Sequence, residues 1–202
     1  IYILGHFNGT YAGNKTNGHW HTFLNKFDKN GNSTGLKILK GSSHVSAREM
    51  KISSDNHIFV SAQSSGTIDG KSRLGGSDIV LAKYDLNLNR KWVTIDGSSG
   101  DDNTSRLEIN NSNKNIILLS DVSGKDQALY KYSSEGKLLS YKSYKQTIND
   151  FIVNNDGSID VIGSAKNPEN NNNDFEIFYG KINPEGGLSE YQYFGSGGNE
   201  SS

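Results

Sequence analysis

The sequence predicts an all-β fold of the β-propeller class, built from four-stranded antiparallel blades. One motif carries much of this prediction: an apolar run, then Lys, then an aromatic residue or Ile, then Asp, Asn or Ser. It occurs four times, as FLNKFD, VLAKYD, ALYKYS and FYGKIN. The spacings between its lysines Lys26, Lys83, Lys131 and Lys181 are 57, 48 and 50 residues. This period is close to the length of one four-stranded blade, and no unit shows the 3.6-residue periodicity of a helix.

The composition supports the same fold class. The chain has 23 Gly and only 2 Pro in a background rich in Asn and Ser, and Gly and Asn adopt the positive φ angles that tight turns require. Hydrophobic residues make up 33% of the chain, and 10 Tyr, 8 Phe and 2 Trp supply bulky core side chains. A chain of 202 residues with this composition is expected to bury a core rather than to be disordered.

Charge and cysteine content exclude several classes of partner and site. The 21 Lys and Arg balance 22 Asp and Glu, and no basic run is present, so a nucleic acid is not an expected partner. No apolar run approaches the roughly 18 residues of a spanning helix, so no membrane insertion is expected in this segment. The absence of Cys excludes disulfides and thiolate metal sites.

The elements of each unit follow one order. The Lys-bearing strand ends in a polar turn with Gly in fourth place, as in DKNG, SSEG and NPEG, which is typical of a β-hairpin. A more alternating, more exposed strand follows, at residues 36–40, 90–95, 138–144 and 188–194. After a loop come strands at 47–53, 105–110 and 148–154. Short apolar runs at 1–4, 58–60, 116–119 and 159–162 then indicate strands buried on both faces.

These elements divide the chain into blades. Residues 1–40 form a partial blade of three strands, complete blades cover about 45–96, 104–145 and 147–194, and residues 195–202 begin the next unit. Long loops at 9–18 and 66–76 precede the first two Lys-bearing strands. Propellers close with about four to eight blades, so we expect about four blades of a larger propeller and a longer polypeptide around this segment. A four-bladed ring with an unseen innermost strand is the alternative.

Several segments resemble the bacterial β-propeller repeats abbreviated SBBP. The residues that carry the resemblance are GGSDIVLAKYD, KWVTIDGSSGDD and NIILLSD, and the loops GTIDGKSRLGG and GTYAGNKTNGH are similar to the Gly-rich links of some such repeats. The third unit departs from the pattern, because residues 144–148 lack the Gly-Gly loop. The resemblance implies a secreted or surface-exposed bacterial protein with many repeats, and it transfers no catalytic residues.

Candidate ligand sites are few. Asp96, Asp101 and Asp102, in the loop DGSSGDD, offer hard oxygen ligands around flexible Gly and are the candidate site for Ca²⁺, the one cofactor considered. The alternative is that these side chains cap their own loop backbone. His19 and His21 could begin a Zn²⁺ site on one strand face, but spacing identifies no third ligand, and the alternative is an exposed pair.

Three aromatic residues, Trp20, Trp92 and Tyr11, are candidate contact residues at rims or edges. Exposed aromatic rings stack on sugars or bind protein partners, whereas packing between blades is the alternative role. The expected function is a non-catalytic scaffold, extracellular or at the cell surface, for adhesion or for protein or glycan contact.

Two other functions stay open. A propeller enzyme, such as a hydrolase or quinoprotein, would need polar residues converging at the channel mouth, where the loops offer Ser, Asp, Arg48 and Arg106 without a repeating acid or metal cluster. The third possibility is a structural repeat of a filament or virion fibre.

Overall fold

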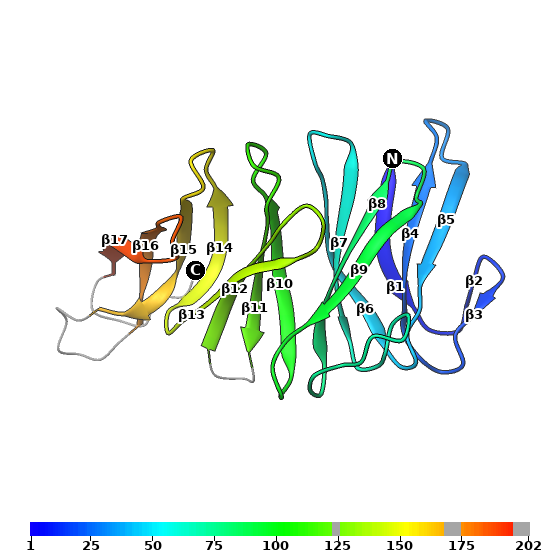
Figure 1. The fold of residues 1–202 in the computed structure, drawn as a ribbon, viewed down its shortest axis with the longest axis horizontal. Coiled ribbons are helices and arrows are strands. Elements are labelled where there is room, and N and C mark those ends of the chain that lie inside the picture. The colour runs from blue at the N-terminus through cyan, green and yellow to red at the C-terminus, as the bar shows by residue number, and fades with distance from the viewer. Residues whose placement is uncertain (123–125, 168–174, 196–202) are drawn as a thin grey trace.

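The computed structural model describes residues 1–122, 126–167 and 175–195. Every regular element in these residues is a β-strand. They contain no helix that is long and apolar enough to cross a bilayer. The strands form three four-stranded sheets, one three-stranded sheet and one small hairpin, each with neighbouring strands antiparallel (Figure 1). The prediction of an all-β chain with four-stranded antiparallel sheets is confirmed.

Each sheet follows chain order, with one exception. The first sheet has the order β1 (Tyr2–Phe7), β4 (His21–Phe27), β5 (Ser33–Leu39), and the hairpin β2 (Thr10–Tyr11) and β3 (Asn14–Lys15) lies between β1 and β4 in the chain. The second sheet consists of β6 (Val45–Ile52), β7 (His57–Ser64), β8 (Asp78–Asp85) and β9 (Arg90–Asp96). The third consists of β10 (Asp102–Ile109), β11 (Ile116–Val122), β12 (Asp126–Tyr132) and β13 (Leu138–Tyr144). The fourth consists of β14 (Thr147–Val153), β15 (Ile159–Lys166), β16 (Phe175–Ile182) and β17 (Leu188–Phe194).

The register irregularities repeat from sheet to sheet. The first strand of each four-stranded sheet carries one extra residue against its partner, at Arg48, Ser105 and Asn149. A second irregularity follows the motif lysines Lys26, Lys83 and Lys131, where the hairpin turn begins. A bulge next to a turn with a left-handed residue lets the strands keep their right-handed twist. The recurrence shows that one structural unit is repeated.

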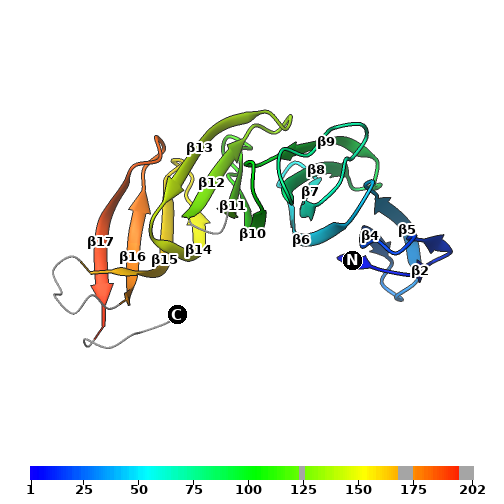
Figure 2. The same ribbon diagram turned by 90° about the horizontal axis from the view of Figure 1, so that it is seen from below.

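The sheets stack face to face in a curved row, as Figure 2 shows from below. Alternate residues of one strand enter different cores: Ile58 and Val60 of β7 face the first sheet, whereas Phe59 faces the third. A separate cluster, including Leu119 of β11 and Val161 of β15, fills the space between the third and fourth sheets. Strands β7 and β11 are buried on both faces, which explains their nearly continuous apolar runs. At the two ends of the row Ile3 and Ile162 are 46% and 44% exposed, so the two-sided burial predicted for residues 1–4 and 159–162 is wrong.

Polar contacts also join successive sheets. The ammonium groups of Lys26 and Lys83 donate to the carbonyls of Leu86 and Ser134, each in the turn of the following sheet, at 3.0 and 3.1 Å. The first strands of neighbouring sheets lie close together: Lys51 pairs with Glu108 at 2.6 Å, and a further ion pair of 3.2 Å links β10 to β14 through Arg106 and Asp150. Figure 2 shows β9 and β13 on the opposite side of the row from β6, β10 and β14. In the described residues the row does not close into a ring, since the first and fourth sheets lie at opposite ends (Figure 1).

Candidate functional site

Two glycine-containing loops interlock where the second sheet meets the third. One is residues 75–78, GGSD, which ends at the first residue of β8, and the other is residues 97–102, GSSGDD, which runs from the end of β9 to the first residue of β10. The amide of Gly76 donates to the carbonyl of Gly100 at 2.9 Å, and the amide of Asp102 donates to the carbonyl of Ser77 at 2.7 Å. The amide of Ser77 in turn donates to Asp101 Oδ1 at 2.8 Å. We call this pair of loops the 75–102 junction.

Gly75 is required by the close approach of the two loops. A Cβ at this position would lie 2.3 Å from the carbonyl oxygen of Gly100 and 2.6 Å from that of Ser98. Both obstacles are backbone atoms, so no side-chain movement could relieve the clash. Gly75 is therefore required for packing, a reason that only the contact between the two loops reveals.

Two buried carboxylates, Asp78 and Asp102, lie at the centre of the junction, and both residues are 0% exposed. Oδ2 of Asp78 accepts from the amides of Leu74 and Gly75 at 2.7 and 3.3 Å. Oδ2 of Asp102 accepts from the amide and hydroxyl of Ser98 at 2.6 and 3.1 Å.

The remaining oxygen of each carboxylate is unusual. Oδ1 of Asp78 and Oδ1 of Asp102 are both buried without a hydrogen-bond partner. A Cβ built on Gly97 would lie 2.7 Å from Asp78 Oδ1 and 2.6 Å from Asp102 Oδ2, so the two carboxylates approach the same point. Buried polar atoms are nearly always hydrogen-bonded, so an unpartnered oxygen on each of two carboxylates that meet beside Gly97 points to a function.

The predicted Ca²⁺ ligands do not converge as one set. The Asp101 carboxylate accepts a hydrogen bond from the Ser77 amide, and the Asp102 carboxylate accepts one from the Ser98 amide. The Asp96 carboxylate accepts from the Thr94 hydroxyl at 3.2 Å. Within the described ranges, no group of three or more His, Cys, Asp or Glu residues could hold a metal ion. The structure therefore does not bring Asp96, Asp101 and Asp102 together as one set of ligands, because each carboxylate is held by a different partner.

Asp78 was missed although the sequence holds a signal for it. Each repeat has an ionisable residue five positions before its motif lysine, and these residues are His21, Asp78, Asp126 and Glu176. His21, Asp78 and Glu176 are buried, although Asp and Glu are rarely found inside proteins. A recurring ionisable residue at the start of a buried strand was therefore the available indication.

A cavity of about 380 Å³ lies beside the junction, lined by Asp96, Gly97, Ser98, Tyr130, Leu138 and Tyr141. The rings of Tyr130 and Tyr141 meet edge to face, with centroids 4.9 Å apart. Tyr130 is buried, whereas Tyr141 is 48% exposed and offers its ring to solvent. Burial raises the pKa of the Asp96 carboxyl above its usual range. The cavity thus combines an exposed aromatic ring with carboxyl and hydroxyl groups.

The corresponding junction between the first and second sheets is rich in histidine. The amide of Val45 donates to the carbonyl of Trp20 at 2.7 Å, and the amide of Trp20 donates to His44 Nδ1 at 3.1 Å. His19 and His44 meet edge to face, with ring centroids 5.1 Å apart. His44 follows His19 by two strands of the first sheet, so spacing in the sequence does not link the two residues.

The burial of the His21 imidazole predicts that the stability of the fold depends on pH. Its pKa is lowered, chiefly because burial disfavours the charged imidazolium and also because Lys40 lies nearby. Such a group stabilises the fold fully above its unfolded pKa of about 6.5, and the contribution is lost as the pH falls toward the folded pKa. We expect His21→Gln to weaken the loss of unfolding free energy between about pH 7 and pH 5, measured by urea denaturation. The exposed His6→Gln is the control, and identical slopes for His21→Gln and wild type would contradict the expectation.

The three candidate contact aromatics lie in different environments. Trp92 donates from its indole nitrogen to the carbonyl of Ser134 at 3.1 Å and packs against Phe59. Tyr11 stacks on Phe23 with ring centroids 4.5 Å apart, which anchors the β2–β3 hairpin on the first sheet. Trp20 is 41% exposed at the histidine-rich junction. Trp92 and Tyr11 are thus packing residues, whereas Tyr141, which the sequence also places on a more exposed strand, has its side chain partly open to solvent.

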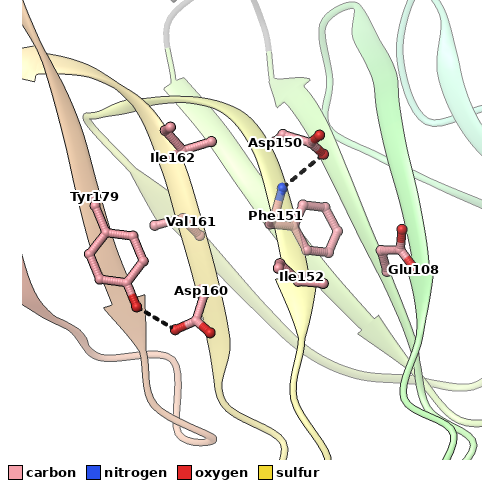
Figure 3. A pocket seen from close by; sticks show the side chains of 8 residues that line it. All are labelled: Glu108, Asp150, Phe151, Ile152, Asp160, Val161, Ile162 and Tyr179. Carbon is pink, nitrogen blue, oxygen red and sulfur yellow. Dashed lines mark hydrogen bonds between the residues drawn. The ribbon is translucent and has the colours of Figure 1, made fainter.

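A second cavity, of about 390 Å³, lies over the outer face of the fourth sheet. Figure 3 shows its lining, with Asp150, Phe151 and Ile152 on β14, Asp160, Val161 and Ile162 on β15, Tyr179 on β16 and Glu108 on β10. The Tyr179 hydroxyl donates to Asp160 Oδ1 at 2.9 Å. Ile152, Ile162 and Tyr179 are 66%, 44% and 36% exposed, so this face is apolar and uncovered in the described chain.

Comparison with known proteins shows a likeness in fold alone. No protein-family model matches the sequence, and no curated protein matches it. A protein of unknown function from Bacteroides caccae, with a crystal structure at 1.35 Å resolution, is similar in fold, with a TM-score of 0.52 at 10% sequence identity. The match covers 96% of this chain and 58% of that one, so the chain spans somewhat more than half of that protein.

Proposed function

We propose that this chain is a run of β-propeller blades of the SBBP repeat type and acts as a non-catalytic scaffold that contacts protein or glycan partners outside a bacterial cell. The observation that carries the architecture is the repeated two-sided burial of sheets, since Phe59 and Val60 of a single strand enter different cores. Sheets stacked in this way, with their first strands adjacent, are what radial blades require. The assignment to the SBBP type rests in addition on the resemblance of the loop sequences to those repeats, and it is part of the same proposal.

The outer face of the fourth sheet supports a larger propeller. Ile162 in the fourth sheet corresponds to Leu119 in the third sheet. Each pairs with the residue that directly follows the extra residue in the first strand of its sheet: Ile162 with Asp150, and Leu119 with Arg106. Leu119 is fully buried by the next sheet, whereas Ile162 is exposed. A further four-stranded sheet of the same polypeptide would cover Ile162 and its neighbours. Such a sheet would also fill the cavity of Figure 3.

The cavity lined by Tyr130 and Tyr141 is the proposed contact site. Its volume of about 380 Å³ falls within the roughly 300–1,000 Å³ of small-ligand sites, which combine apolar walls with a few polar groups. An exposed Tyr ring provides a flat apolar surface for a sugar ring, and the groups of Asp96 and Ser98 beside it can bond sugar hydroxyls. These features favour a glycan as the bound partner.

Screening of the chain on a glycan array is expected to find a glycan class whose binding depends on Tyr141. Tyr141→Ala should weaken that binding by about ten-fold, since an aromatic contact contributes about 0.5–1.5 kcal/mol beyond its area. Tyr179→Ala, which removes an equally large ring from the fourth sheet, is the matched control and should bind as wild type does. An array without a binder, or equal losses in both variants, would contradict glycan recognition at this cavity.

A further inference from the structure

We propose that Asp78 and Asp102 hold a calcium ion inside the 75–102 junction and that this ion fastens the second sheet to the third. The proposal rests on the two orphaned carboxylate oxygens, both in residues without solvent exposure. It does not depend on the glycan site or on ring closure.

The charge of the pair needs a positive partner. Among the ion pairs that the described residues form, none involves Asp78 or Asp102. The nearby cations are directed elsewhere: Lys71 donates to the carbonyl of Val93 at 2.8 Å, and Arg73 donates to the carbonyls of Ser65 and Gly76 at 3.3 and 3.1 Å. Two carboxylates removed from water without a counter-charge are strongly destabilising. A bound cation removes this cost.

The available ligands favour Ca²⁺ over other metals. Both carboxylates present hard oxygen atoms, and the carbonyl oxygens of Ser98 and Gly100 lie in the same junction, next to Gly75. Ca²⁺ accepts carboxylates, backbone carbonyls and waters in irregular geometry, whereas Zn²⁺ favours nitrogen and sulfur ligands, and Mg²⁺ demands a near-ideal octahedron. Gly97 borders both the two carboxylates and the 380 Å³ cavity.

The fold explains why the pair is formed by residues far apart in sequence. Asp78 begins β8 and Asp102 begins β10, so the ion would join a middle strand of one sheet to the first strand of the next. With only two carboxylates, the affinity is expected to be in the range of extracellular calcium modules, roughly 10⁻⁴–10⁻³ M. Such an ion would act as a structural fastener in a calcium-rich medium.

The test titrates Ca²⁺ into the chelator-treated chain, to about 10 mM, with calorimetry and thermal unfolding as readouts. The melting temperature of the wild type should rise by roughly 4–8 °C. Asp78→Asn should lower the affinity at least about ten-fold, and the double variant Asp78→Asn, Asp102→Asn should not respond. Without Ca²⁺ the double variant should melt no lower than the wild type, because the repulsion between the two carboxylates is gone.

Asp101→Asn is the matched control, because Asp101 belongs to the same loop and its Oδ1 already accepts from the Ser77 amide. It should keep the Ca²⁺ response. NaCl of equal ionic strength should not reproduce the rise in melting temperature. The proposal is overturned if Ca²⁺ gives neither heat nor a higher melting temperature. It is equally overturned if NaCl has the same effect, or if Asp101→Asn loses the response as fully as Asp78→Asn does.

Discussion

Leu118→Ala is expected to lower the free energy of unfolding by about 2–5 kcal/mol, the largest effect of any substitution considered for this chain. Leu118 lies on β11, is 0% exposed, and belongs to the cluster that fills the space between the second and third sheets. Truncation removes favourable burial and leaves a cavity, because β-sheet backbones on both sides prevent collapse around it.

Urea denaturation of the two proteins, with the slopes compared, measures this loss. Leu139→Ala is the control: Leu139 lies on β13 and is 47% exposed, so its truncation should cost less than about 1 kcal/mol. Similar losses for Leu118→Ala and Leu139→Ala would show that the sheets do not pack tightly on one another.

Gly163→Ala is expected to destabilise the fold by about 1–3 kcal/mol or more through steric overlap. A Cβ on Gly163 would lie 1.9 Å from the carbonyl oxygen of Thr147 and 3.0 Å from the Cα of Ile148. Both atoms belong to the backbone of β14, which pairs with β15 at this point, next to the register shift after Ile148. The two strands would have to separate, which breaks ladder hydrogen bonds.

Scanning calorimetry should show a melting temperature lower by roughly 2–4 °C per kcal/mol for a chain of this size. Gly35→Ala is the matched control, since Gly35 also lies in a strand and the atoms nearest to its added Cβ belong to side chains, the closest being Leu88 Cδ1 at 3.4 Å. If Gly163→Ala melts at the temperature of Gly35→Ala, the close approach of Thr147 is not a feature of the folded protein.

The strands themselves were accessible from the sequence because their signals are local. The runs before Lys83 and Lys131 became β8 and β12, and the Gly-ended turns after Lys26, Lys131 and Lys181 became hairpins with left-handed Gly31, Gly136 and Gly186. In the second unit Leu88, at φ 65°, takes the left-handed position where the pattern lacks Gly. The hairpin β2–β3 was read as a loop, because its strands are two residues long and depend on Tyr11 packing against Phe23.

The candidate site was only partly accessible. Asp102 was identified from its loop, but its partner Asp78 is brought to it by the pairing of β8 with β9 and the turn into β10. His44 reaches His19 in the same way, across two strands. Residues 138–143 of β13 are all exposed, so the exposure of Tyr141 follows from the position of β13 at the edge of its sheet, whereas its contact with Tyr130 depends on the pairing of β12 with β13.

The sequence by itself determined the all-β class, the repeated unit and the apolar middle strands, because turn chemistry and apolar runs act between residues close in the chain. Only the tertiary structure decided which polar side chains meet, where water is excluded from the Asp78 and Asp102 carboxylates, and which sheet face is left uncovered. Those properties arise from contacts between different sheets, and the free energy of a buried charge depends on everything that surrounds it in space.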